Sequence, residues 1–397
     1  MPTESLDSVT LVATTDFHSS VPDGLATLEA LARLREEGAF LIDAGDFYGG
    51  NSFHEFSAGR YEEEIAAELF HAMVPGNHDF ADLQRLRDPK RYPPVVCANV
   101  VPPDSYPGRW ESGLLLPERG RRVGVVGYIG TQAFNAIPTD ERAGFTFTEP
   151  TPALLAAEHA RLREAGADVV IGVSHTGLER DIAFQTSGQS PFDIIVAGHC
   201  HCSYYQWSAD GRHVVKAPEL GAGLLRIDLR GDGTTWFTVH HHRGPAGRTG
   251  PGSKALGPYR DWGETVLGTL PEPIADRTEL AHQLCEGART AIEADAFLLN
   301  LATLRTGLPA AVTRRALADA APFDGPLVRL QSQHLFEDLE RRALEHGEEP
   351  VLATSGLDRG SVVTTAYLAG RLGLPAEPVH PHTIRSTITD LFGGTHE

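Results

Sequence analysis

The first 240 residues alternate short apolar runs with helix-like stretches, and this alternation limits the folds open to the chain. Helical spacing of apolar residues occurs at 24–37, 62–70 and 152–165. The apolar runs, typical of buried strands, lie at 9–15, 39–46, 71–79, 93–100, 122–130, 167–175 and 193–200. Strands separated by helices predict an α/β layer fold around largely buried strands.

The pattern changes after residue 211. Residues 212–239 predict antiparallel strands with a turn at Gly-Asp-Gly. A stretch rich in Gly and Pro follows, so we expect a first domain at 1–242 and a linker at 243–262. We expect a second domain at 263–397.

The second domain begins with a helical pattern at 279–294 and a strand-like run at 296–304. We expect helices and loops around 327–331 and 350–355. The sequence therefore predicts a smaller α+β domain here.

Composition and charge exclude several classes of protein. The chain has 34 Lys and Arg against 53 Asp and Glu, a net charge of −19, which disfavours binding to nucleic acid or to an anionic membrane. No apolar run approaches the roughly 18–20 residues that a membrane span needs. The first residues lack a basic segment followed by a long apolar one, so we expect no signal peptide and a cytoplasmic protein.

Polar side chains follow five of the apolar runs at their carboxyl ends. Ligands of open α/β sheets bind outside these ends of the strands. Imidazole, carboxylate and amide oxygen suit Mn, Fe, Zn or Co, and two such ions can hold a phosphoryl group and activate water. Asp46 stands alone after its run and could bridge two ions. The residues are Asp16 and His18, Asp46, Asn77 and His78, His175, and His199 and His201.

Each of these motifs by itself is common in loops that only satisfy polar groups. All five in order, each after an apolar run, favour a metal site over that structural explanation.

The order DxH, GD, GNHD, H, GHxH resembles that of the calcineurin-like metallophosphoesterases. The segments TTDFHS, LIDAGD, GNHDF, CANV with Asn99, SHTG and the C-terminal extension are similar to the 5′-nucleotidase branch. The resemblance covers residues 9–240. It implies a four-layer α/β/β/α sandwich.

The resemblance also implies two divalent metal ions, with Mn, Fe, Zn, Co and Mg as candidates. One ion would take Asp16, His18, Asp46 and His201, and the other Asp46, Asn77, His175 and His199. Metal-bound hydroxide would attack phosphorus in line. His78 would not bind metal but would stabilise developing charge and assist the leaving oxygen.

One departure affects His78. Many 5′-nucleotidases read GNHEFD, and the final Asp orients the catalytic His. This chain has Ala81 at that position, so Asp79 or Asp82 would take the role.

In 5′-nucleotidases the C-terminal domain binds the nucleoside part of the substrate. Asn300 and Arg305 match the Asn and Arg of one family pattern at the same spacing, and Phe323 matches the Phe of a later pattern. The resemblance implies that these three residues bind substrate. The intervening glycines and the GGDG-aromatic segment are missing. The expected substrate is therefore an unusual nucleotide or a sugar phosphate. If the second domain takes no part in recognition, Tyr204, Tyr205 and Trp207 are the next candidates.

We thus expect a phosphomonoesterase that acts on a small phosphorylated metabolite inside a biosynthetic pathway. A phosphodiesterase or pyrophosphohydrolase acting on cyclic nucleotides or nucleotide sugars is the alternative enzyme, because the same metal pair serves both. A decayed phosphatase fold acting as a binding protein is the non-enzyme alternative. We expect no nucleic acid or membrane partner, and a homodimer stays open.

Overall fold

The computed structural model describes residues 8–116, 121–242, 250–331 and 335–392. The chain forms two compact units. The first comprises residues 1–49 and 57–256, and the second comprises 50–56 and 257–397.

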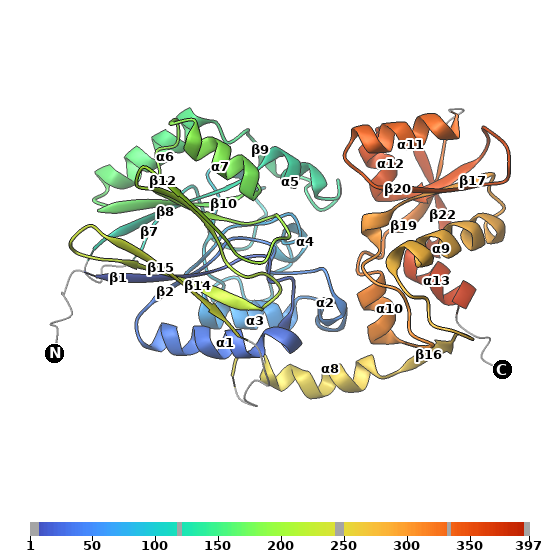
Figure 1. The fold of residues 1–397 in the computed structure, drawn as a ribbon, viewed down its shortest axis with the longest axis horizontal. Helices are drawn as coiled ribbons and strands as arrows, with labels where there is room; N and C mark the ends of the chain where they lie inside the picture. The colour runs from blue at the N-terminus through green and yellow to red at the C-terminus, as the bar shows by residue number, and fades with distance from the viewer. Residues whose placement is uncertain (1–7, 117–120, 243–249, 332–334, 393–397) are drawn as a thin grey trace. The chain divides into compact units, whose positions relative to one another are not determined.

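The first unit contains two large β-sheets (Figure 1). One sheet has the order β15 (Thr235–His241), β14 (Gly223–Leu229), β1 (Val9–Thr14), β2 (Phe40–Asp43), β3 (Ala72–Met73), β4 (Val95–Val96) and β6 (Trp110–Glu111). The other has the order β12 (Tyr205–Ala209), β13 (Arg212–Lys216), β11 (Ile194–Ala197), β10 (Val169–His175), β8 (Val123–Ile129) and β7 (Leu114–Leu115).

The two sheets pack face to face, and their inner faces form one apolar core. Leu11 and Phe40 from the first sheet join Ile171 and Val196 from the second in this core. Helices α1 (Val21–Glu36) and α3 (Arg60–Leu69) lie on the first sheet's side, and α6 (Pro152–Glu164) and α7 (Leu178–Thr186) cover the second sheet (Figure 1). The expected four-layer α/β/β/α sandwich is confirmed. Shorter elements complete the unit: β5 (Val100–Val101), β9 (Thr146–Phe147), α4 (Phe80–Leu83), α5 (Thr131–Ala136) and η1 (Ser253–Ala255).

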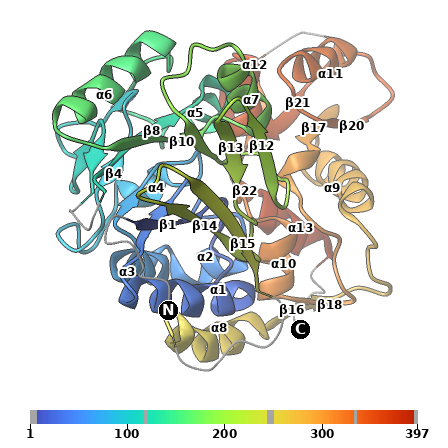
Figure 2. The same cartoon turned by 60° about the vertical axis from the view of Figure 1, so that its left-hand side comes forward.

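The strands expected at 212–239 divide between the two sheets. β14 and β15 form the expected antiparallel pair with a turn at Gly233. β13 instead joins the second sheet, where it lies beside β12 (Figure 2) and pairs antiparallel with it. Its other neighbour is β11, with which it pairs parallel. A local pattern predicts a strand but not its partner, because pairing depends on residues far away in the chain.

The second unit is built on a mixed sheet of five strands. β17 and β21 are parallel, and the other pairs are antiparallel. The order is β20 (Pro350–Thr354), β17 (Ala296–Asn300), β21 (Val362–Thr365), β19 (Pro326–Leu330) and β22 (Ala376–Thr383). A further pair is β16 (Val266–Thr269) and β18 (Ala311–Thr313).

Helices pack on both faces of this sheet because side chains alternate along β17. Phe297 and Leu299 pack with α9 (Arg277–Ala291) and α13 (Ile384–Phe392), and Leu298 packs with α11 (Phe336–Glu345) and α12 (Ala366–Leu372). The remaining helices are α2 (Ser52–Ser57), α8 (Leu256–Gly263), α10 (Arg314–Ala320) and η2 (Leu301–Thr303).

Two expectations for this half differ from the structure. The stretches around 327–331 and 350–355, expected as helices and loops, form strands β19 and β20, because both pack their apolar side chains into the sheet. Of the expected linker 243–262, residues 243–249 lie outside the described part. The rest forms a turn, η1 and α8, in which Tyr259 is buried.

Residues 50–56 belong to the second unit, although in the sequence they follow β2, a strand of the first unit. Ser52 donates its backbone N–H to Asp319, and its hydroxyl lies 2.5 Å from that of Tyr259. Phe53 packs against the same tyrosine ring. These contacts tie the segment to elements more than 200 residues away, which a local pattern does not show.

In the described ranges, none of the helices combines the length and the apolar character that crossing a membrane requires.

Candidate metal centre

The loops that follow β1 and β2 are joined by backbone hydrogen bonds. Asp16 N donates to Gly45 O at 2.9 Å, and His18 N donates to Asp46 O at 2.9 Å. Asp16, His18, Asp46 and His199 all have positive φ, between 48° and 78°. Non-glycine residues rarely adopt this conformation, and it concentrates at functional sites. The surrounding fold therefore holds the candidate residues in backbone conformations of high energy.

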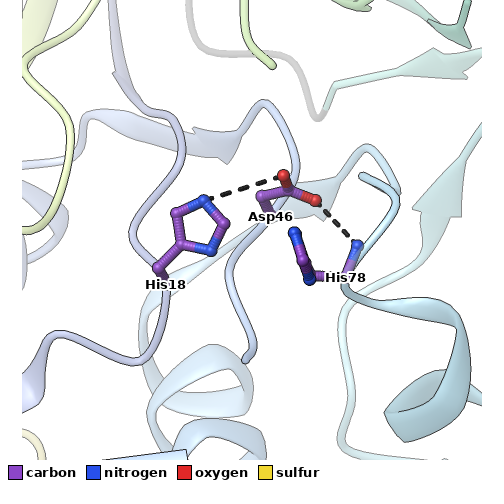
Figure 3. A group of neighbouring side chains, drawn as sticks. All are labelled: His18, Asp46 and His78. Carbon is purple, nitrogen blue, oxygen red and sulfur yellow. Dashed lines mark hydrogen bonds and ion pairs between the residues drawn. The ribbon is translucent and has the colours of Figure 1, made fainter. Parts of the chain in front are cut away.

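Asp46 lies at the centre of the arrangement (Figure 3). Its Oδ2 lies 3.7 Å from Nε2 of His18 and 3.3 Å from Nε2 of His175. Its Oδ1 accepts a hydrogen bond from the backbone N–H of His78 at 2.9 Å. One carboxylate thus contacts His175 at the end of β10 and residues that follow two other strands, β1 and β3.

Two groups of candidate donors share Asp46. One consists of His18, Asp46 and His78, and the other of Asp46, His175 and His199; within each group the donor atoms lie within 4.8 Å of one another. Asn77 Oδ1 and His199 Nδ1 are buried and, among the described residues, make no hydrogen bond. Buried polar atoms without partners are costly, and a cation would satisfy them. The donor set therefore fits divalent metal ions.

The charges of these groups suit metal binding. Burial lowers the pKa of His18 to about 3 and that of His199 to about 4, so both rings are neutral at neutral pH, the form that binds metal. Burial opposes ionisation of Asp46, but His175 and His78 outweigh it and hold the pKa of that carboxyl well below its usual range. Burial likewise opposes the charge on His175, but Asp46 raises its pKa to about 9. A cation at Asp46 would replace that proton.

Neighbouring groups orient these side chains. Nδ1 of His175 lies 2.9 Å from Ala44 O, which leaves Nε2 directed at Asp46. A Cβ on Gly76 would lie 2.2 Å from Oδ1 of Asp46, so this position requires glycine.

Asp79, expected as a partner of His78, is buried and binds backbone. Its carboxylate accepts hydrogen bonds from the N–H groups of Asp46 at 2.9 Å, Tyr48 at 3.0 Å and Gly76 at 2.7 Å. It therefore joins the loops after β2 and β3. Asp82, the other candidate, lies next to Gly59.

Asp16 and His201 stand apart from the two donor groups. Asp16 is fully buried beside Lys216, whose Nζ lies 3.1 Å from its Oδ2. The ring of His201 stacks on that of His18 with centroids 5.2 Å apart, while its Nδ1 lies 3.4 Å from Oε2 of Glu219.

Lys216 is a residue of this centre that sequence analysis missed. It is the last residue of β13, and its side chain is completely buried. The sequence feature that could have identified Lys216 is its place at the end of an apolar run, in a chain with only three lysines.

The three predicted substrate residues lie in the second unit, and two of them are neighbours. The guanidinium carbon of Arg305 lies 5.3 Å from the centroid of the Phe323 ring. Asn300 is buried, donates to the carboxylate of Glu348, and accepts from the backbone N–H groups of Ala302 and Glu349. Its amide therefore holds the end of β17 in place, while Arg305 and Phe323 form a cationic and aromatic pair.

Residues 9–203 match the family described as calcineurin-like phosphoesterase. The chain is 30% identical over 205 residues to a 5′-nucleotidase from Diplobatis ommata, a match that covers 47% of this chain and 33% of that protein. It is 27% identical over 197 residues to an apyrase from Tabanus yao, with 45% and 33% covered. The match thus spans about one third of the length of these relatives.

The crystal structure of a 5′-nucleotidase precursor from Thermus thermophilus has the same fold. It superposes with a TM-score of 0.74 over 97% of this chain and 96% of that chain, at 16% identity. The segment that matches the family, residues 9–203, contains all of the predicted metal residues together with His78. Residues 9–203 therefore form a calcineurin-like phosphoesterase domain, and the chain resembles the 5′-nucleotidase branch of that family.

Proposed function

We propose that this chain is a phosphoric ester hydrolase that depends on two divalent metal ions and removes phosphate from a nucleotide or a related sugar phosphate. The observation that carries the proposal is the position of Asp46 in both donor groups. Asp46 has His18 on one side and His175 and His199 on the other, and a carboxylate between such imidazoles is suited to hold two cations close together. The 5′-nucleotidase named among the relatives supports the same reaction class.

Asp16, His18, Asp46 and His201 would hold one ion, and Asp46, Asn77, His175 and His199 the other. When bound, such ions polarise the phosphoryl oxygens and make water a nucleophile at neutral pH. The imidazoles of His18 and His199 are already neutral and the carboxylate of Asp46 is already ionised, whereas His175, whose pKa Asp46 raises to about 9, would give up its proton to the ion. Binding therefore requires little loss of protons from His18, His199 and Asp46.

His78 is the group proposed to assist the leaving oxygen. Asp46 fixes its backbone N–H at 2.9 Å, and its ring lies edge-on to that of His18 with centroids 5.0 Å apart. The ring is thus held beside the donor atoms, where a proton can be given to an alkoxide.

Phosphate release tests the proposal. Chelator-treated protein is expected to release no phosphate from AMP or p-nitrophenyl phosphate, and added Mn²⁺ is expected to restore release. Hydrolysis that persists without metal would contradict the metal requirement. A folded, metal-loaded protein that hydrolyses no phosphate ester would favour a binding protein with a phosphatase fold.

A second candidate is a phosphodiesterase or pyrophosphohydrolase, and the named apyrase among the relatives supports it. The same donor groups serve either reaction. Faster turnover of ADP or bis-p-nitrophenyl phosphate than of AMP would favour this candidate. The opposite order would support the phosphomonoesterase.

A further inference from the structure

The candidate metal centre contains a positively charged side chain, that of Lys216. Lys216 is the last residue of β13, which runs parallel to β11, so it stands at the same sheet edge from which His199 follows β11. Its side chain is completely buried. A buried ammonium group is costly unless anionic groups face it. Here Asp16 Oδ2 lies 3.1 Å and Glu219 Oε2 lies 3.6 Å from the Nζ atom.

Asp16 and Asp46 differ in what their oxygens contact. Oδ1 of Asp16 accepts from the backbone N–H of His199 at 2.9 Å, and its Oδ2 accepts from the Thr15 hydroxyl at 2.5 Å in addition to pairing with Lys216. Oδ2 of Asp46, by contrast, faces the ring nitrogens of two histidines. The charge of Asp16 is therefore already balanced by the chain, whereas that of Asp46 faces groups that bind metal.

His201, assigned to the same metal position as Asp16, also has a competing partner. Its Nδ1 lies 3.4 Å from Oε2 of Glu219, the same oxygen that faces Lys216. About half of its side chain is exposed. Within the described residues, neither Asp16 nor His201 belongs to the two compact donor groups.

We propose that Lys216 makes the two metal positions unequal. Its ammonium group balances Asp16, so the position formed by Asp16, His18, Asp46 and His201 binds a divalent ion more weakly than the position formed by Asp46, Asn77, His175 and His199. Like charges a few ångströms apart in a buried site repel strongly. This inference rests on the metal centre of the proposed function.

Titration of chelator-treated full-length protein with Mn²⁺ alone tests the inference. Calorimetry and the electron paramagnetic resonance of free Mn²⁺ give the two dissociation constants. We expect the second ion to bind at least about ten-fold more weakly than the first. In Lys216→Gln, which removes the charge and offers an amide oxygen, the second constant is expected to tighten at least about ten-fold, while the first changes little.

Two further variants complete the design. Lys90→Gln removes a lysine charge at an exposed position and is expected to change neither constant. Glu219→Gln removes one of the two anions that face Lys216 and is expected to weaken the second constant further. If Lys216→Gln does not fold, as judged by circular dichroism and thermal unfolding, Glu219→Gln still tests the inference, because its expected effect on the second dissociation constant is the opposite one.

The outcomes separate this inference from the proposed function. Two equal constants in the wild type, or a ratio that neither Lys216→Gln nor Glu219→Gln changes, would overturn the role of Lys216 and leave the metal centre standing. Absence of any Mn²⁺ uptake by folded protein would overturn both. Phosphate release reports separately on the hydrolase activity.

Discussion

Asp46 is the residue whose replacement tests both metal positions at once. Asp46→Asn keeps the shape of the side chain but removes the charge that both donor groups share. We expect metal content to fall at both positions and phosphate release to fall at least about 10³-fold. Elemental analysis and a phosphate assay measure these effects, with the exposed Asp104→Asn as a matched control. Full metal content in Asp46→Asn would contradict the bridging role.

His78 tests the division between metal binding and proton transfer. His78→Ala is expected to keep both metals and to lower kcat about 10²–10⁴-fold, the usual range for a positioned acid or base. The ring lies within a group of atoms that fits a metal, so the metal content decides its role. If metal content and activity fall together, His78 is a ligand.

Replacement of Asp79 tests whether the carboxylate that follows His78 stabilises the fold or takes part in catalysis. Its three backbone hydrogen bonds predict that Asp79→Ala lowers the free energy of unfolding by about 2–4 kcal/mol, because buried N–H groups lose their acceptor. Denaturant unfolding measures this, with Asp82→Ala compared in parallel. Unchanged stability together with reduced kcat would instead make Asp79 the partner that orients His78.

At the scale of elements, Asp181 joins α7 to β10 beside the centre. Its Oδ1 accepts from the Ser174 hydroxyl at 2.8 Å and from the Tyr128 hydroxyl at 3.4 Å. Burial raises the pKa of this carboxyl to about 7. The folded protein therefore keeps a proton that the unfolded chain releases near pH 4. This makes the free energy of unfolding fall as pH rises from about 4 to about 7.

Asp181→Asn removes this titration. The difference in the free energy of unfolding, variant minus wild type, is expected to rise by up to about 1.4 kcal/mol per pH unit between about pH 4 and 7 and to stay constant at higher pH. Urea unfolding of metal-free protein across this range measures it. A difference that does not change with pH would show that the buried carboxyl titrates normally.

At the scale of the whole molecule, the candidate metal residues lie in the first unit, and the Arg305–Phe323 pair lies in the second. If that pair recognises substrate, Arg305→Ala raises KM for a nucleotide about 10–100-fold through loss of a charge-assisted contact. Hydrolysis of p-nitrophenyl phosphate should stay nearly unchanged. Steady-state kinetics on both substrates, with the exposed Arg314→Ala as control, decide this. Equal losses on both substrates would remove the second unit from recognition.

Most of the first unit could be predicted from the sequence. Buried strands are read from local apolar runs, and β1, β2, β8, β10 and β11 lie where those runs stand. The polar residues at the ends of these strands come from both sheets: within each sheet the parallel strands end at one edge, and the contact of Asp46 with His175 joins the two edges. β19 and β20 could not be predicted in this way, since a short apolar run fits a buried strand and a helix equally.

The sequence by itself determined the buried strands of the α/β layers and the polar residues that follow them around Asp46, because both depend on patterns within a few residues of each strand. The arrangement of these layers as a sandwich was implied by the family resemblance and not by a local pattern. Only the tertiary structure decided which sheet β13 joins. That choice brings Lys216 to within 3.1 Å of Asp16, 200 positions earlier in the chain. It likewise decided that the Asn300 amide is held by Glu348, 48 positions away. Contacts between residues so far apart in the sequence depend on tertiary packing, so a local sequence pattern does not predict them.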